Sequence, residues 1–376
     1  MFYNCLSDEC IKSTLAKESK TLMKLDINKS YNFLIVRPDH IGDVVLSLPV
    51  AESLKTRFKN SKVYYLAKDY TAPLFENSPF VDGVINLNTN GKFDKVSLVR
   101  RLKAAKIDVS ISLVADKETT PALFKARIPI RIGSFMKLYS LLLTKRVRQK
   151  RSLCLKNEAE YNLDIIKTLG CDTNFFPKLY VSDEESKKAK AFIESNFKEK
   201  KPLVIIHPGS NGNSVEWGKE NFLTLASKLR TNYNVLITGS SNEMKDILNT
   251  KEAKNLDEEN FLKPVSLREF MALINEASLL MTNSTGPLHV AGALGVQTIG
   301  FYPDKLTMNC FRWGSFTKDD KGIYITPSGV YHGMKTYKEP DLAKDDLKRI
   351  DMDSIKVSEV LELVQKSLKT SRINHA

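Results

Sequence analysis

The chain has 376 residues, 42% of them hydrophobic, and a formal net charge of +13. This length and composition predict two ordinary globular domains and exclude a disordered chain. No apolar run approaches the roughly 18 residues of a membrane-spanning helix, no signal peptide is evident, and the five scattered cysteines have neither disulfide nor metal spacing, so we expect a cytoplasmic protein with reduced thiols.

The first half of the chain alternates apolar strands with amphipathic helices, after an irregular extension over residues 1–29. Strands are expected at 32–37, 62–67, 83–87, 108–114 and 128–133, and helices at 43–58, 96–105 and 158–169. This alternation predicts a parallel sheet with helices on both faces.

A strongly basic segment contains the fifth predicted strand. Residues 119–157 contain no Asp or Glu but ten Lys and Arg, Lys137 among them. A block of this length whose charged side chains are all positive indicates an acidic partner, either a phosphorylated glycan or an anionic lipid surface. The plain alternative is a solvated basic face. Aromatic residues are sparse in the block, so nucleic acid is not an expected partner.

The second half repeats the alternation. Strands are expected at 202–207, 234–238, 279–281 and 297–301, helices at the start of 183–201 and at 219–230, 242–248, 266–276 and 353–369, and loops over 315–350. We place the domains at 1–180 and 181–376, with the last helix packing back on the first domain. Two such Rossmann-like units imply a cleft lined by the loops at the carboxyl ends of the strands.

Residues 279–294, LLMTNSTGPLHVAGAL, predict a buried strand, a polar turn and a helix. Pro287 falls in the first turn of that helix, where a missing N–H costs little. Free backbone N–H groups and the positive end of the helix dipole then meet around Ser284, Thr285 and Gly286, which predicts an anion site. His289 lies one turn further and is either a packing residue or a ligand contact.

The loop after the first strand collects polar side chains, because Arg37, Asp39, His40 and Asp43 all fall within seven residues. An Asp at the start of a helix is ordinarily an N-cap, which accounts for one carboxylate and not for the crowding. Since this loop is expected to face the second domain, it is a candidate catalytic loop.

The loop after the strand at 202–207 reads HPGSNGNS. Glycines and small polar residues after a strand suit close approach to a phosphate or a sugar. Two residues that follow leave alternatives open. Trp217 is either core or a cover for a bound ring, and Lys219 is either solvated or paired with a diphosphate.

Taken together, residues 33–49, 206–217 and 282–294 resemble the motifs of the family 9 glycosyltransferases, the heptosyltransferases of bacterial lipopolysaccharide core assembly. The resemblance implies an α/β GT-B fold, with parallel sheets facing across a cleft, the acceptor on the first domain and the nucleotide-sugar on the second. It also implies an inverting transfer without metal or cofactor, in which Asp43 is the general base. ADP-heptose is the default donor and an anionic glycolipid the acceptor, with peripheral contact at the inner face of the cytoplasmic membrane.

With the resemblance, we assign donor binding to Ser210, Lys219, Ser284, Thr285, Gly286 and His289, and acceptor binding to Arg37, His40 and Arg131. Two positions depart from the family: Ser284 stands where it usually has Asp, and Val215 where it often has Lys. Lys219 or Lys305 is the expected replacement for that cation. Two alternatives stay open. One is a nucleotide-sugar hydrolase or epimerase of the same fold, and the other, which the two departures favour, is an inactive module that binds glycan or nucleic acid.

Overall fold

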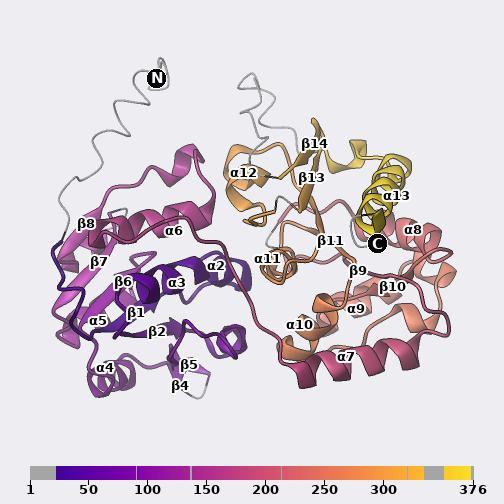
Figure 1. Cartoon of the computed structure of the whole chain (residues 1–376). Helices are drawn as coiled ribbons and strands as arrows, with labels where there is room; N and C mark the ends of the chain where they lie inside the picture. Colours follow the sequence, from indigo (N-terminus) through magenta and orange to yellow (C-terminus); the bar gives the residue numbers. More distant parts are fainter. Residues whose placement is uncertain are drawn as a thin grey trace, which may run out of the picture.

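The computed structural model describes residues 23–89, 91–135, 138–212, 214–319, 321–333 and 351–373. Within these ranges the chain forms two α/β units, each built on a six-stranded sheet with helices on both faces (Figure 1). The predicted α/β architecture is therefore confirmed. Most of the predicted N-terminal extension, and Lys137 of the basic block, lie outside the described residues.

The first sheet has the order β3-β2-β1-β6-β7-β8, and its strands are parallel. Residues 33–36 of the central strand are completely buried, as expected where helices cover both faces of a parallel sheet. The strands are β1 (Asn32–Val36), β2 (Lys62–Ala67), β3 (Gly83–Asn86), β6 (Val109–Ser112), β7 (Ile130–Ser134) and β8 (Lys145–Val147), with a separate ribbon of β4 (Asn88–Thr89) and β5 (Lys92–Phe93). The helices are α2 (Ile41–Val45), α3 (Leu48–Arg57), α4 (Lys95–Ala104), α5 (Thr119–Lys125) and α6 (Glu158–Ile166), with short 3-10 turns η1 (Asp69–Phe75), η2 (Leu138–Leu142) and η3 (Arg151–Leu153).

The second sheet has the order β10-β9-β11-β12-β13-β14, with only the last pair antiparallel. Its strands are β9 (Leu203–His207), β10 (Asn234–Ile237), β11 (Leu279–Asn283), β12 (Thr298–Phe301), β13 (Gly322–Thr326) and β14 (Gly329–His332). The helices are α7 (Asp183–Asn196), α8 (Lys219–Leu229), α9 (Ser241–Leu248), α10 (Leu267–Asn275), α11 (Gly286–Ala293), α12 (Cys310–Trp313) and α13 (Val357–Ile373).

The predicted helix at 43–58 is in fact two helices, α2 and α3. Ser47 separates them, and its hydroxyl donates a hydrogen bond to the carbonyl of Val44. Pro49 then occupies the first turn of α3, where proline suits a new helix better than the continuation of an old one. This break leaves α2 as a short helix at the carboxyl end of β1, and α2 carries Asp43.

Two further differences concern short strands. The three-residue edge strand β8 lies inside the basic block, where no alternating pattern marks it. The hairpin of β13 and β14 falls in the region predicted as loops, although β13 is entirely buried. Strands of three to five residues carry too little periodicity to stand out against polar flanks.

Helix α13 packs on its own half of the chain, and the prediction that it returns to the first domain is wrong. Val360, Val364 and Leu368 join the core around β9 and α8 (Figure 1). Trp217 anchors this packing, because its indole Nε1 donates to the carbonyl of Ile355 at 2.9 Å and its ring lies on Phe301 with centroids 4.3 Å apart. Trp217 is therefore a core residue and does not cover a ligand.

Replacing Trp217 by Phe tests this anchor. The variant loses the hydrogen bond to the carbonyl of Ile355 and part of the stacked area, so we expect the free energy of unfolding to fall by about 2 kcal/mol. Urea titration followed by circular dichroism measures it. An unchanged free energy of unfolding would show that α13 docks without help from the indole.

Candidate active site

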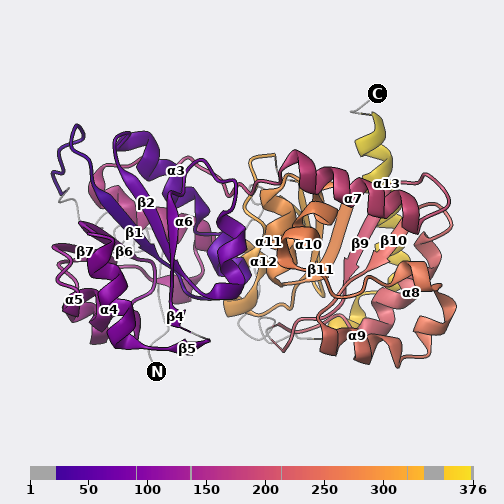
Figure 2. The same ribbon diagram turned by 90° about the horizontal axis from the view of Figure 1, so that it is seen from below.

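A cavity of about 960 Å³ lies between the two sheets and is lined by both halves of the chain. Its first wall is the loop at residues 40–43 together with Tyr70 and Pro73. The second wall comes from the carboxyl ends of β9, β10 and β11 and from residues 262–270 and 307–313. Figure 2 shows α11 at the boundary between the two units, and α2 is the element of the first unit that packs against it.

Asp43 lies in the first turn of α2 and lines this cavity. The N-cap of α2 is His40, so the carboxylate of Asp43 is not a capping group. It accepts a hydrogen bond from Nη2 of Arg37 at 2.5 Å, with 18% of its side chain exposed. One side of the carboxylate is thus paired with a cation, and the other side is open to the cavity. A general base needs this arrangement.

Arg37 is buried and does not line the cavity, so the predicted direct contact with the acceptor is not supported by its position. Its guanidinium lies 3.1 Å from Asp39 and reaches both Asp43 and Glu158. Burial lowers the pKa of Arg37, but Asp43, Glu158 and Asp39 outweigh that effect and raise its pKa overall. Arg37 therefore stays charged and acts on Asp43.

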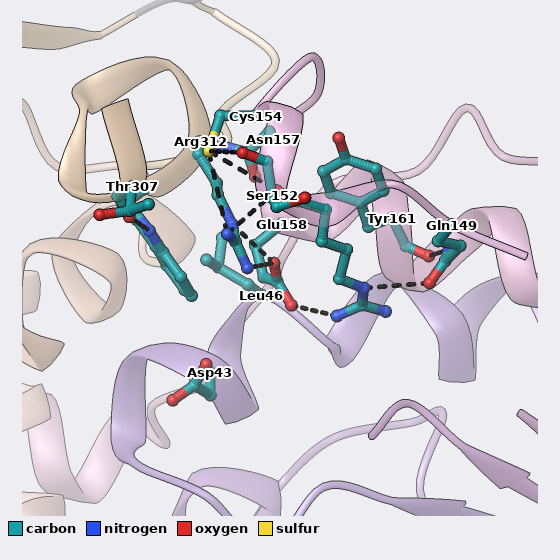
Figure 3. Close-up of polar contacts among 12 residues, drawn as sticks. Asp43, Leu46, Gln149, Ser152, Cys154, Asn157, Glu158, Tyr161, Thr307 and Arg312 are labelled. Atoms are coloured by element: carbon teal, nitrogen blue, oxygen red, sulfur yellow. Dashed lines mark hydrogen bonds and ion pairs between the residues drawn. The ribbon is translucent and has the colours of Figure 1, made fainter. Parts of the chain in front are cut away.

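Glu158, the first residue of α6, is the centre of a buried ion cluster. Its Oε1 accepts from Arg37 and Arg151. Its Oε2 accepts from Nε and Nη2 of Arg312 at 3.2 and 3.1 Å, a pairing drawn in Figure 3. Burial lowers the pKa of Arg151 to about 10, although Glu158 opposes that shift. Sequence reasoning missed Glu158 and Arg312 and placed Arg151 on a basic surface, whereas its side chain is only 8% exposed.

The predicted donor side of the cavity lies where β11 ends and α11 begins. Ser284, Thr285 and Gly286 all line the cavity, as predicted. Thr285 is the N-cap of α11, yet its hydroxyl caps no backbone N–H and pairs instead with Thr282 at 2.8 Å. Pro287 has no N–H, and the N–H of Leu288 donates to the carbonyl of Thr285 at 3.2 Å. The N–H of Gly286 is therefore the group of this turn that is left for an anion.

Glycines bring the two sides of the cavity into contact. A Cβ atom on Gly42 would lie 2.6 Å from Cδ2 of His289, and one on Gly286 would lie 3.0 Å from Cβ of Ile41. A side chain at Gly42 would collide with the imidazole, and one at Gly286 would crowd Ile41, so the close approach of α2 to α11 depends on glycine, above all at Gly42. The contact sets Asp43 directly beside the predicted donor site.

His289 packs against Gly42 and also lines the cavity, so its role in packing is confirmed and its contact with a ligand stays a prediction. Burial lowers its pKa to about 4, with a small opposing effect from the charge of Asp43. The imidazole is therefore neutral at neutral pH.

Ser210 and His40 also line the cavity, whereas Lys219 and Lys305 do not. Ser210 donates to Glu216 at 2.6 Å, which orients its hydroxyl at the rim. Among the cavity-lining residues that the structure describes, the one lysine is Lys263, and it is exposed. No motif in the sequence marks Lys263. It reaches the site because it comes directly after the buried Leu262.

Arg131 does not line the cavity either. Its Nε donates to the carbonyl of Leu142 at 2.8 Å, and its guanidinium lies 5.4 Å from the centre of the Phe124 ring. It belongs to the outer part of the first unit, since β7 is two strands away from β1. The predicted acceptor residues are therefore divided, with only His40 at the cavity.

The chain belongs to glycosyltransferase family 9 (heptosyltransferase), which it matches over residues 96–319, more than half of its length. It is 25% identical to lipopolysaccharide heptosyltransferase 2 of Escherichia coli over 291 residues, covering 72% of this chain and 82% of that one. It is 29% identical over 306 residues to a Haemophilus influenzae protein provisionally assigned as a glycosyltransferase, covering 78% and 88%.

Solved structures confirm the GT-B fold. The family 9 glycosyltransferase of Veillonella parvula superposes with a TM-score of 0.74 at 20% identity, over 92% of this chain and 99% of the other. The ADP-heptose LPS heptosyltransferase II of E. coli gives a TM-score of 0.72 at 19% identity, over 91% and 99%. The protein is therefore a glycosyltransferase by family and by fold.

The buried imidazole of His289 makes stability depend on pH. Its folded pKa of about 4 lies below the ordinary value of 6.5, so the unfolded chain takes up the proton first as the pH falls. We expect its contribution to be intact above pH 6.5 and to be lost between pH 6.5 and 4, by about 2 kcal/mol at pH 4.5. Urea unfolding of the wild type and of His289→Asn at pH 7.5 and 4.5 measures the difference. Equal losses in the two proteins would contradict it.

Proposed function

We propose that this protein transfers a heptose from ADP-heptose to an anionic lipopolysaccharide or related surface glycan, with inversion and without a metal. The observation that carries the proposal is the contact of α2 with α11, which sets Asp43 beside the donor site. The names of relatives support the substrates, since they include lipopolysaccharide heptosyltransferases 2 and 3 of E. coli.

In the proposed reaction, Asp43 accepts the proton of the acceptor hydroxyl as its oxygen attacks the anomeric carbon of the heptose. The bond from that carbon to the diphosphate oxygen breaks on the opposite face, and the nucleoside diphosphate leaves with the electron pair. One displacement inverts the anomeric centre. The N-terminus of α11 and the ammonium group of Lys263 face the charge that develops on the leaving group.

The two departures from the family both bear on the donor. Ser284 faces the cavity where the family usually has a carboxylate, so this site repels an anionic or electron-rich donor group less. Val215 packs against the core and supplies no cation, and Lys263 takes that role in our proposal. The base and the leaving-group site are unaffected, so the reaction class is kept while the preferred nucleotide is the feature to test.

Replacing Asp43 by Asn tests the base. We expect transfer to fall by about 10²–10⁴-fold, while ADP still raises the melting temperature because the α11 site is intact. Mass spectrometry of the glycan and the release of ADP measure transfer, with GDP- and UDP-linked sugars as comparisons. Unchanged turnover in the variant would remove Asp43 from the mechanism.

The wild-type protein in the same assay separates the alternatives. Release of nucleotide that requires the acceptor identifies a transferase. Release without acceptor identifies a hydrolase or epimerase, and retained binding without any turnover identifies a module that has lost the chemistry. The last two outcomes would each overturn the proposal.

A mixed basic and apolar surface lies on the outer part of the first unit, and we propose that it contacts the anionic inner leaflet that holds the acceptor. In the described residues, five of the eleven exposed large hydrophobic side chains fall between residues 124 and 141. These are Phe124, Phe135, Leu138, Tyr139 and Leu141. Arginines are interleaved with them, since Arg146 and Arg148 both lie over the Phe135 ring. No helix in the described part of the chain is both long and apolar enough to cross a membrane.

Charge reversal at Arg146 and Arg148 tests this surface. Because each basic residue near an anionic bilayer contributes about 1 kcal/mol, we expect the double Glu variant to bind phosphatidylglycerol vesicles more than tenfold more weakly at low salt. Cosedimentation measures binding, with neutral phosphatidylcholine vesicles beside it. The matched control reverses the exposed Lys251 and Lys254 of the second unit. Equal loss in the control would mean that only net charge matters, and that outcome would contradict a docking surface.

A further inference from the structure

The ion cluster at Glu158 joins three separate segments of the chain. Arg37 comes from the end of β1, Arg151 from η3 and Arg312 from α12. The carboxylate of Glu158 is almost fully buried, with 1% of its side chain exposed. A carboxylate in that position is stable only while its arginine partners stay in place, so the cluster fixes the relative position of the three segments.

Arg312 reaches the cluster from the second unit and belongs to a wall of the cavity. Its neighbours Thr307 and Trp313 line the cavity, and its guanidinium lies 4.6 Å from the centre of the Trp313 ring. Asn157, next to Glu158, donates to the carbonyl of Gly314 at 3.1 Å. The segment 307–314 is thus docked on the start of α6 by a charged and a neutral contact, side by side (Figure 3).

At the other end of the cluster, one nitrogen serves two carboxylates. Nη2 of Arg37 donates to Asp43 at 2.5 Å and to Glu158 at 3.2 Å. Nη2 carries two hydrogens, so Glu158 and the proposed base each accept one, and both depend on the charge and position of the same guanidinium. While Arg312 neutralises Oε2 of Glu158, Arg37 is left to Asp43; when Arg312 is absent, Glu158 draws more strongly on Arg37.

We propose that Arg312, Glu158 and Arg37 form a positioning relay through which docking of the cavity wall at residues 307–314 orients Asp43 and sets its strength as a base. The relay rests on the proposed function, in which Asp43 removes the acceptor proton. Through this relay, Asp43 reaches its full strength as a base only when the second unit is docked on the first. None of the three residues of the relay lines the cavity, so each acts through Asp43.

Two substitutions should move the pH dependence of transfer in opposite directions. Arg312→Met leaves Glu158 to draw more strongly on Arg37, so we expect the acidic limb of the kcat/KM profile to rise by about one pH unit. Glu158→Gln frees Arg37 for Asp43, so we expect the same limb to fall and the plateau of kcat to drop, because a better stabilised carboxylate is a weaker base. Loss of activity in both variants with an unmoved limb would overturn the relay.

The double variant separates a relay from charge acting through space. If the effect of Arg312 passes through Glu158, then Arg312→Met should no longer move the limb in the Glu158→Gln background. A shift of the same size in that background would also overturn the proposal. Arg312→Lys keeps a cation for Glu158 and should restore most of the wild-type profile, whereas a role in packing alone would not be rescued.

The matched control is Arg268→Met. Arg268 is another largely buried arginine at the boundary, which pairs with Glu185 at 2.5 Å and donates to the carbonyl of Pro73. It should reduce stability without moving the limb. The other titratable groups that face Asp43 are Asp39, His289 and Tyr70, and all three are kept in every variant.

A readout without turnover keeps the relay testable if the proposed function fails. Carboxyl NMR of protein labelled with ¹³C-aspartate follows the titration of Asp43 directly, with Asp43→Asn to assign its resonance. The midpoint should rise in Arg312→Met and fall in Glu158→Gln whether or not ADP-heptose is the donor. Absence of transfer by the wild type with shifted midpoints would reject the function alone, and unshifted midpoints would reject the relay.

Discussion

The arrangement of the site depends on the shared guanidinium of Arg37. Taking a cation and two carboxylates out of water costs several kcal/mol for each ion, and hydrogen bonds from fixed partners must offset that cost. Here β1 supplies the cation, α2 and α6 supply the carboxylates, and α12 completes the cluster from the second unit. Because each group is stable only with the others in place, the two halves of the chain are joined by the same contacts that hold Asp43.

The two units divide the chemistry between them. The first holds a carboxylate paired with a permanent cation, and the second offers the N-terminus of α11 together with Lys263. Neither half contains both the group that takes a proton and the groups that stabilise a leaving diphosphate. In the proposed mechanism the reaction therefore lies at the boundary between the units, where a change in their relative position acts on both parts at once.

The sequence predicts the parts of this site that local physics determines. Strands β1, β9 and β11 are continuous apolar runs, and the capping box at Ser266 marks the start of α10, so the loops that carry Asp43 and Ser284 to Gly286 could be placed in advance. The direction in which a side chain points could not be predicted from the sequence. For this reason Lys219 and Arg131, which were assigned to the site, lie away from the cavity. The pairing of Glu158 with Arg312 spans 154 positions, and no periodicity or spacing reports a contact of that range.

Gly42 has no functional group, yet it determines the distance between Asp43 and the donor, on which the proposed reaction depends. Its missing Cβ lets the imidazole of His289 approach the backbone of α2, and Asp43 is the next residue along. Any side chain at this position would act as a spacer between the units, moving the carboxylate away from the donor by about the thickness of a methyl group. Since displacements near 1 Å can cost about 10²-fold in rate, the missing side chain of Gly42 preserves the distance on which the proposed reaction depends.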